Sequence, residues 1–296
     1  MKILVTGGSG FIGSHVVDEL VKNEYDVRVF DKANPKRDDV EWFKGDLLDE
    51  KSVLEACKDV EAIFHLAAIA DVNVALSHFD VCLMVNEMGT MNFLKSATAQ
   101  EVQRIILAST TWVYGRTKGV VTEDLPLPLP EHIYTKTKIG QEQLLYSWHL
   151  HHGLPYTILR YDIPYGPRMR SNMAISIFVR RALRGEPITV FGDGSQGRCW
   201  IYVKDLAEGN VAVLTESAKN EIINLAGPDF VSIRQIAEAV KKIFGDVEIK
   251  HESARPHDFK GSVTSIEKAK RLLKWSPKTS FEAGLQKYVE YVKNLS

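Results

Sequence analysis

The N-terminal run KILVTGGSGFIG, residues 2–13, constrains the fold more than any other part of this sequence. It places glycines at positions 7, 8, 10 and 13 between an apolar, β-branched segment and a predicted helix, Ile12–Lys22. A backbone that turns sharply there, lets a ligand approach and packs a new helix tightly on a sheet has no room for Cβ atoms. The run therefore predicts a strand–turn–helix unit. The first amides of its helix would donate hydrogen bonds to the pyrophosphate of a dinucleotide.

The acidic residue that ends the next predicted strand, Asp26–Asp31, indicates which dinucleotide binds there. Asp31 would accept hydrogen bonds from the adenosine ribose hydroxyls and would repel a 2′-phosphate, which favours NAD over NADP. Lys32, Lys36 and Arg37 leave NADP as the alternative. We expect NAD to be bound by Gly7, Gly10, Phe11, Ile12, Gly13, Asp31 and Lys32.

Strand-like and helical segments alternate through the first half of the chain. The predicted strands are Lys2–Thr6, Asp26–Asp31, Ala62–Leu66, Arg104–Ser109 and Tyr156–Tyr161, with a weaker one at Glu41–Lys44. The predicted helices are Ile12–Lys22, Ser52–Ala56, Val85–Ala99 and Thr135–His149. This alternation predicts βαβ crossovers and an α/β fold with a doubly wound parallel sheet of the Rossmann type.

After Tyr161 the pattern changes to a Pro-, Gly- and Arg-rich stretch, a basic helix at Ile175–Arg184 and three later helical segments. We expect residues 1–165 to form the NAD-binding domain, to which 199–226 return. Residues 166–198 and 227–296 would form a smaller α+β substrate domain over the carboxyl ends of the strands, where open α/β sheets bind ligands.

The composition argues against several classes of protein. The 296 residues include 37 basic and 38 acidic side chains, and this balance predicts no nucleic-acid partner. Neither a leader segment nor an apolar run of membrane-spanning length is evident, so we expect a cytoplasmic protein without a membrane partner. The three cysteines, Cys57, Cys82 and Cys199, lie far apart, and the histidines at 149, 151 and 152 lack ligand partners. We therefore expect no disulfide and no metal site.

Tyr134 and Lys138 are the predicted catalytic pair. Spacing of i,i+4 places them on one face of a helix. A phenol has an unperturbed pKa of about 10, and a neighbouring ammonium lowers that pKa towards a value useful for general base catalysis. Such a pair is common by chance, but here it follows a dinucleotide turn. The hydroxyl of Thr110, at the end of a predicted strand, could bind the same reacting oxygen.

In these motifs the chain resembles the extended short-chain dehydrogenase/reductases, and within them the nucleotide-sugar epimerases and dehydratases. The resemblance covers nearly the whole chain and rests on TGGSGFIG, HLAA, STTWVYG, YTKTK, RYDIPYGPR, GDGSQGRCWIYVKD and ARPHDF. It implies that Thr110 supplies a hydroxyl, that Tyr134 is the catalytic base and that Lys138 binds the ribose. It also implies cofactor contacts from Asp46, Leu47, Leu66, Ala67, Ala68, Asn86 and Tyr161.

For the substrate, the resemblance implies contacts from Thr111, Phe191, Arg198 and Arg255. The two arginines match residues that hold a sugar nucleotide's diphosphate. Arginine suits this role because a guanidinium can donate two parallel hydrogen bonds to phosphate oxygens. Phe191 lies where a nucleobase often packs. The alternatives are solvent-exposed arginines and a core Phe191.

The sequence departs from the family pattern at positions that bear on chemistry. Ile163 replaces an asparagine near the substrate diphosphate, and Cys199 replaces an aspartate. Thr111 and Trp112 stand where the dehydratases carry Asp-Glu. At the position of Trp112, the decarboxylases tend to carry a glutamate. Without those carboxyl groups, dehydration and decarboxylation lack their acid–base group, and oxidation followed by re-reduction at one carbon remains.

We therefore expect an NAD-dependent 4-epimerase of UDP-glucose, UDP-galactose or a related UDP-sugar, which works through a 4-keto intermediate. One alternative is a one-way NAD(P)-dependent reductase or dehydrogenase of a keto-sugar nucleotide or another carbonyl compound. A catalytically silent NAD-sensing regulator is a third hypothesis. Leu144, Leu145 and Trp148 give the Tyr134 helix a wide apolar face, which predicts a homodimer through this helix and Val85–Ala99, with burial in the core as the other explanation.

Overall fold

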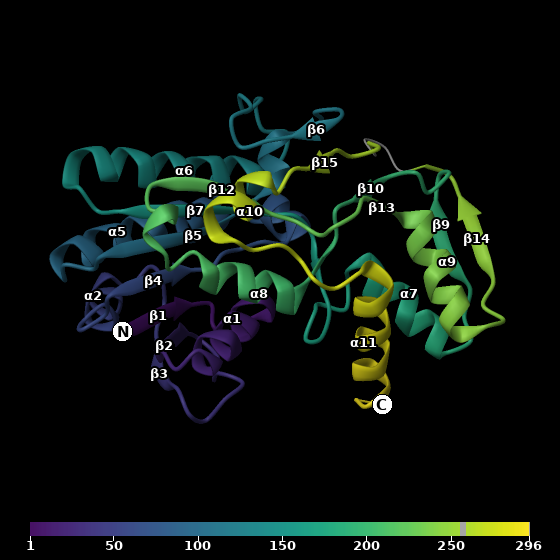
Figure 1. The fold of residues 1–296 in the computed structure, drawn as a ribbon, viewed down its shortest axis with the longest axis horizontal. Coiled ribbons are helices and arrows are strands. Elements are labelled where there is room, and N and C mark those ends of the chain that lie inside the picture. Colours follow the sequence, from purple (N-terminus) through teal and green to yellow (C-terminus); the bar gives the residue numbers. More distant parts are fainter. Residues whose placement is uncertain (255–258, 296) are drawn as a thin grey trace.

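A seven-stranded parallel sheet forms the centre of the computed structural model, which describes residues 1–254 and 259–295 (Figure 1). The strand order is β12-β7-β5-β4-β1-β2-β3, and every neighbouring pair is parallel. The strands are β1 (Lys2–Thr6), β2 (Asp26–Asp31), β3 (Glu41–Lys44), β4 (Ala62–His65), β5 (Arg104–Thr110), β7 (Tyr156–Tyr161) and β12 (Glu221–Leu225). The predicted doubly wound parallel sheet is thus confirmed, and β12 is a seventh strand that the sequence patterns did not predict.

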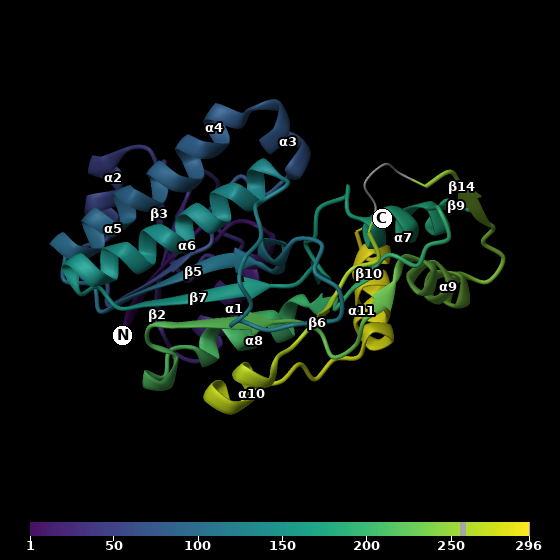
Figure 2. The same ribbon diagram turned by 90° about the horizontal axis from the view of Figure 1, so that it is seen from above.

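Helices cover both faces of this sheet, as Figure 2 shows. One face packs on α1 (Phe11–Lys22), α8 (Val203–Ala212) and α10 (Glu267–Leu273). The other packs on α2 (Glu50–Ala56), α5 (Gly89–Ala99) and α6 (Ile133–His152). Burial on both faces explains why the strands are apolar along most of their length rather than alternating.

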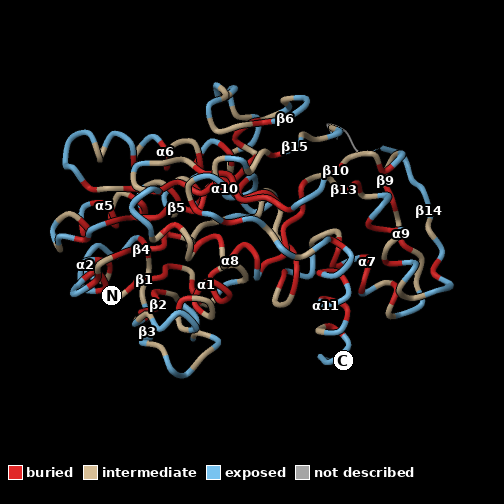
Figure 3. The backbone as a smooth tube through the Cα atoms, viewed as in Figure 1, coloured by how far each residue is buried: buried red, intermediate tan, exposed pale blue. Residues whose placement is uncertain are grey.

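A second hydrophobic core lies beyond the carboxyl ends of the strands (Figures 1 and 3). Its helices are α7 (Ala174–Leu183), α9 (Ile233–Phe244) and α11 (Phe281–Lys293). Four two-stranded sheets pair β6 (Val120–Val121), β8 (Pro164–Tyr165), β9 (Ile188–Phe191), β10 (Gly197–Arg198), β11 (Ile201–Tyr202), β13 (Val231–Ser232), β14 (Ile249–Glu252) and β15 (Val263–Thr264). The predicted domain boundaries stay a prediction.

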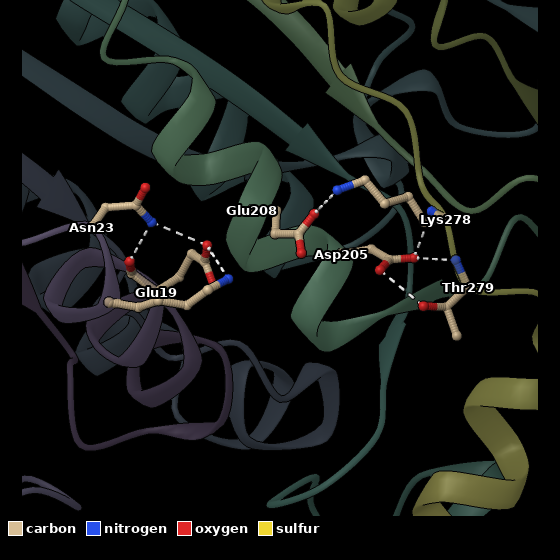
Figure 4. Close-up of polar contacts among 7 residues, drawn as sticks. Glu19, Asn23, Asp205, Glu208, Lys278 and Thr279 are labelled. Atoms are coloured by element: carbon tan, nitrogen blue, oxygen red, sulfur yellow. Dashed lines mark hydrogen bonds and ion pairs between the residues drawn. The ribbon is translucent and has the colours of Figure 1, made fainter.

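Helix α8 ties the segment before α11 to the sheet domain (Figure 4). The Asp205 carboxylate accepts hydrogen bonds from the backbone amides of Lys278, at 3.0 Å, and Thr279, at 2.7 Å. It also accepts one from the Thr279 hydroxyl, and Lys278 pairs with Glu208 at 2.8 Å. Because Asp205 is buried, these bonds fix where the chain crosses from one core to the other.

The segment between β4 and β5 differs from its prediction. Two short helices that were not predicted, α3 (Val72–Ser77) and α4 (Phe79–Leu83), lie in it. The predicted helix Val85–Ala99 begins as a π-helical turn, η1 (Met84–Met88), before α5. Short 3₁₀ turns occupy η2 (Thr111–Tyr114) and η3 (Glu216–Ala218). Among the described helices, none combines the length and apolar character that a bilayer span requires.

Candidate active site

The turn after β1 leaves no room for side chains where the pyrophosphate is predicted to lie. Gly7 has a φ of +69°, and a Cβ there would lie 2.9 Å from the Cα and N atoms of Ala67. A Cβ on Gly13 would overlap the Gly7 carbonyl oxygen. Helix α1 begins at Phe11, and its N-cap Gly10 provides no side-chain oxygen for the first amides. The turn therefore packs closely on its own backbone, and the first amides of α1 have no side-chain cap, as an anion such as a pyrophosphate requires.

Asp31 braces the same turn. Its carboxylate accepts hydrogen bonds from the backbone amides of Ser9 and Ala33, each at 3.0 Å. These bonds hold the acidic group at the end of β2, beside the glycine turn, where an adenosine ribose is expected.

Two of the three cations that left NADP as an alternative, Lys32 and Arg37, are engaged with carboxylates. Lys32 Nζ lies 2.8 Å from the Asp46 carboxylate, and this hydrogen bond lowers the pKa of Asp46. Arg37 pairs with Asp39 at 2.6 Å. A 2′-phosphate would have to compete with these carboxylates for Lys32 and Arg37, so the arrangement favours NAD.

The loop after β4 closes the other side of the predicted groove. The amides of Leu66 and Ala67 both donate to the Thr6 hydroxyl, each at 3.1 Å. Leu66, Ala67 and Ala68 are half-buried. His65 lies below them between the hydroxyls of Thr6 and Thr90, and burial lowers its pKa to about 3. His65 is therefore a neutral hydrogen-bonding residue at neutral pH.

Asn86 holds this loop against α6. Its side-chain oxygen accepts a hydrogen bond from Ile69 N at 2.8 Å, and its side-chain nitrogen lies 2.9 Å from the Thr137 hydroxyl. Asn86 is on the π turn, a departure from α-helical geometry that is frequent at functional sites. Leu47 is buried against the start of α5, with Asp46 half-buried before it.

Three predicted catalytic residues come from neighbouring elements. Thr110 is the last residue of β5, while Tyr134 and Lys138 lie one turn apart near the start of α6. Lys138 Nζ donates a 2.7 Å hydrogen bond to the Ala108 carbonyl oxygen and lies 6.0 Å from the centre of the Tyr134 ring. Tyr134, Lys138 and Thr110 therefore meet at the carboxyl edge of β5.

The pKa of Tyr134 differs from its prediction. Burial raises this pKa above its usual value, and the Arg170 charge and a hydrogen bond with Thr110 only partly oppose the shift. Burial also lowers the pKa of Lys138, to about 8, while the nearby Glu142 charge raises it. Desolvation of the Tyr134 phenol therefore sets the direction of its pKa shift, which is opposite to the lowering predicted from the Lys138 ammonium.

Glu142 and Arg160 form a buried ion pair behind the catalytic candidates that the sequence patterns missed. The Arg160 guanidinium donates to both Glu142 oxygens, at 3.1 and 2.7 Å, and Ser109 Oγ donates to the same carboxylate. Glu142 lies four residues after Lys138, so i,i+4 spacing could have placed it on the same helix face. Its partner could not be identified without the fold.

A cavity of about 340 Å³ opens beside Thr111 and Thr135, the residues that follow Thr110 and Tyr134. Much of its lining is apolar: Trp112, Pro128, Leu129, Ile163, Trp200 and Phe259. Its charged lining residues are Arg116, Glu131, Asp162 and Arg198. Thr110 and Tyr134 are not part of the described lining, so the cavity adjoins the catalytic candidates.

The predicted substrate residues occupy different places. Thr111 and Arg198 line the cavity, and the Arg198 guanidinium lies 4.5 Å from the centre of the Phe259 ring. Phe191 ends β9 and is half-buried, outside the described lining of the cavity. Arg255 lies outside the described residues.

The predicted cofactor residue Tyr161 is buried in the sheet core. Its hydroxyl donates to the side-chain oxygen of Asn210 on α8. Any contact of Tyr161 with a cofactor would therefore have to come from its backbone.

Comparisons with known proteins agree with this architecture. Residues 3–226 match the model of the NAD dependent epimerase/dehydratase family. A UDP-N-acetyl-alpha-D-glucosaminuronate decarboxylase of Bacillus cytotoxicus is 31% identical over 99% of this chain and 98% of its own length.

Two solved structures are similar over the whole chain. A UDP-glucose 4-epimerase from Thermotoga maritima, with UDP-glucose, has a TM-score of 0.92 and 34% identity over 100% of this chain and 99% of its own. A UDP-glucuronic acid 4-epimerase from Bacillus cereus, with UDP-glucuronic acid and NAD, has a TM-score of 0.93 and 34% identity over 100% of both chains. The expected cofactor, NAD, agrees with the NAD dependence of the matched family. The chain belongs to the NAD-dependent epimerase/dehydratase family, within the extended short-chain dehydrogenase/reductases.

Proposed function

We propose that this chain is an NAD-dependent 4-epimerase of a UDP-sugar and works through a 4-keto intermediate. The relatives act on UDP-sugars as epimerases or as decarboxylases. The observation that carries the choice is Thr111-Trp112, which puts a hydroxyl and an indole, and no carboxylate, directly after Thr110. A decarboxylase or dehydratase would need an acid–base group there.

In this proposal Tyr134 takes the proton from the sugar 4-hydroxyl, and Thr110 binds the same oxygen. NAD accepts the hydride from carbon 4 and returns it. Lys138 binds the ribose and stays anchored to Ala108. When the hydride returns to the opposite face of the ketone, the phenol gives its proton back to the oxygen, and the configuration at carbon 4 is inverted.

The alternative is a one-way oxidoreductase of a keto-sugar nucleotide or another carbonyl compound. Ile163 favours it, because an aliphatic side chain lines the cavity where the family pattern has an asparagine. Such an enzyme would exchange its cofactor at every turnover.

One experiment separates the possibilities. The purified, NAD-loaded protein is incubated with UDP-glucose and, in a separate reaction, with UDP-glucuronate, and the products are followed by proton NMR together with absorbance at the NADH wavelength. We expect UDP-galactose to form without net NADH. Stoichiometric NADH with an accumulating keto product would instead identify a dehydrogenase, and carbon dioxide from UDP-glucuronate would identify a decarboxylase.

We also propose a homodimer formed through neighbouring helices on the α6 side of the sheet. Apolar side chains are exposed there on α3, α4 and η1: Leu76, Phe79, Val81, Met84 and Met88. Leu145, which the sequence offered to this interface, is instead buried in the core, while Leu144 and Trp148 pack partly against it. Light scattering coupled to size-exclusion chromatography tests the dimer, and a monomeric mass at micromolar concentration would contradict it.

A further inference from the structure

The cavity beside Thr111 and Thr135 is placed to select among UDP-sugars. Because these residues directly follow Thr110 and Tyr134, groups on the carbons next to the reacting carbon would be the ones that enter it. Its volume of about 340 Å³ lies at the lower end of pockets that bind small ligands. This volume holds a sugar with its substituent, and Arg198 on the same lining is the residue expected to meet the diphosphate.

The wall of this cavity is poorly suited to a charged substituent. Trp112, Ile163 and Trp200 surround it with aromatic and aliphatic surface, and Leu129 and Phe259 add to it. A carboxylate that leaves water for such surroundings loses its hydration, and it needs a paired cation to compensate.

The cations on the lining are already engaged. Arg116 Nε lies 2.9 Å from a Glu131 carboxylate oxygen, so an incoming carboxylate would compete with Glu131 for this guanidinium. The Arg198 guanidinium lies over the Phe259 ring, and its charge favours the ionised form of the nearby Asp162 carboxyl.

Asp162 adds a buried carboxyl group to the lining. Its side chain is 3% exposed and accepts hydrogen bonds from the Thr264 hydroxyl at 2.7 Å and the Ile163 amide at 2.9 Å. Burial raises the pKa of Asp162, which these two bonds and the Arg198 charge oppose. A second carboxyl group beside Asp162 would suffer either repulsion or the cost of taking up a proton.

One polar group on the lining lacks a partner among the described residues. Thr135 is 3% exposed, and within the described part of the chain its hydroxyl has no hydrogen-bond partner. An unpartnered buried hydroxyl costs stability, so a ligand hydroxyl or amide that reaches it would be favoured.

We infer that this cavity takes an uncharged substituent, such as a hydroxymethyl or N-acyl group, and excludes a carboxylate. On the proposed function, the substrates are then neutral UDP-hexoses and not UDP-hexuronates. This separates the chain from the relatives named for glucuronate and its derivatives.

The test compares kcat/KM of the NAD-loaded enzyme for UDP-glucose, UDP-N-acetylglucosamine and UDP-glucuronate, with epimers separated by anion-exchange chromatography. We expect the better neutral substrate to exceed UDP-glucuronate by at least about 100-fold. An equal or higher value for UDP-glucuronate overturns the inference but leaves the epimerase proposal standing.

Calorimetric binding to the Tyr134→Phe variant keeps the inference testable without turnover. UDP-glucose is expected to bind at least about 10-fold more tightly than UDP-glucuronate. If this order holds while the unmodified enzyme epimerises none of the three, the proposed function fails and the inference stands. If neither ligand binds, or UDP-glucuronate binds more tightly, the inference fails.

Variants that replace one carboxyl group by an amide test whether these carboxyl groups cause the exclusion of UDP-glucuronate. Asp162→Asn should raise the relative kcat/KM, or the relative affinity, for UDP-glucuronate by about 10-fold. Glu131→Gln, an exposed change that releases Arg116, should act in the same direction and serves if Asp162→Asn does not fold. Asp246→Asn, an exposed change outside the described lining, should leave the ratio unchanged. An unchanged ratio in both cavity variants overturns the charge argument.

Discussion

The Lys138 ammonium on α6 donates a 2.7 Å hydrogen bond to the Ala108 carbonyl oxygen on β5. This bond joins the helix that carries Tyr134 to the strand that ends at Thr110, so it sets the register between the two reacting hydroxyls. Lys138 is 3% exposed, and burial brings its pKa down to about 8 from 10.5. The same group therefore orders the site and makes stability depend on pH.

The first prediction concerns that dependence. Below pH 8 the Lys138 side chain is charged in both the folded and the unfolded chain, and the folded state bears the full cost of desolvating that charge. Above pH 10.5 neither carries it, so stability should rise through this window, by on the order of 3 kcal/mol at about 1.36 kcal/mol for each pKa unit. Urea unfolding of the wild type and Lys138→Met, from pH 7.5 to 10.5, measures it. The difference between the two proteins removes the titration of other groups, and a difference that does not change with pH would refute the lowered pKa.

The second prediction concerns the buried pair behind Lys138. Glu142→Gln leaves the Arg160 charge in the interior without its carboxylate, which should cost about 3–5 kcal/mol of unfolding free energy. It also removes a charge that raises the pKa of Lys138, so the alkaline limb of the activity profile should move to lower pH. Glu142→Gln combined with Arg160→Met should recover part of the stability in urea unfolding. A double variant no more stable than Glu142→Gln would show that the unpaired charge is not the cause.

A third prediction assigns the proton transfer. Tyr134→Phe removes the hydroxyl proposed to act on the sugar oxygen, and general acid–base groups typically contribute 10²–10⁴-fold, so kcat should fall by about that factor. Bound NAD and thermal stability should stay near the wild-type values. Tyr146→Phe, an exposed tyrosine on the same helix, is the control and should keep full activity. If Tyr134→Phe retains most of the activity, Tyr134 is not the residue that transfers the proton.

The sheet was largely predictable because its signals are local. Apolar runs such as Lys2–Thr6 and Tyr156–Tyr161 have the length and composition of buried parallel strands, and the structure gives them the same bounds. β4 ends one residue before its prediction, because the Leu66 amide donates to the Thr6 hydroxyl. β12 was missed because its five residues become a strand only by pairing with β7, more than sixty positions earlier in the chain.

The chemistry of the site was less predictable. Spacing alone put Tyr134 and Lys138 on one helix face, but their pKa values depend on burial by distant segments. The π turn at Met84–Met88 depends on Asn86 reaching Ile69 and Thr137, contacts that no helical periodicity encodes. The cavity's chemistry likewise depends on Asp162 meeting Thr264 across about a hundred residues.

The last prediction tests the glycine turn that is proposed to bind the cofactor, with two glycines of nearly equal φ. Gly7 and Gly185 have φ angles of +69° and +67°, so alanine should impose a similar strain of about 1 kcal/mol at each. A Cβ on Gly185 meets nothing within 4 Å, whereas one on Gly7 presses on the Ala67 backbone. Gly7→Ala should therefore lower the NAD content of the purified protein at least about 10-fold, while Gly185→Ala retains it. Chromatography of the nucleotides released by denaturation gives both values. Equal NAD contents would mean that the turn can accept a Cβ, and that close approach of the backbone at Gly7 is not what binds the cofactor.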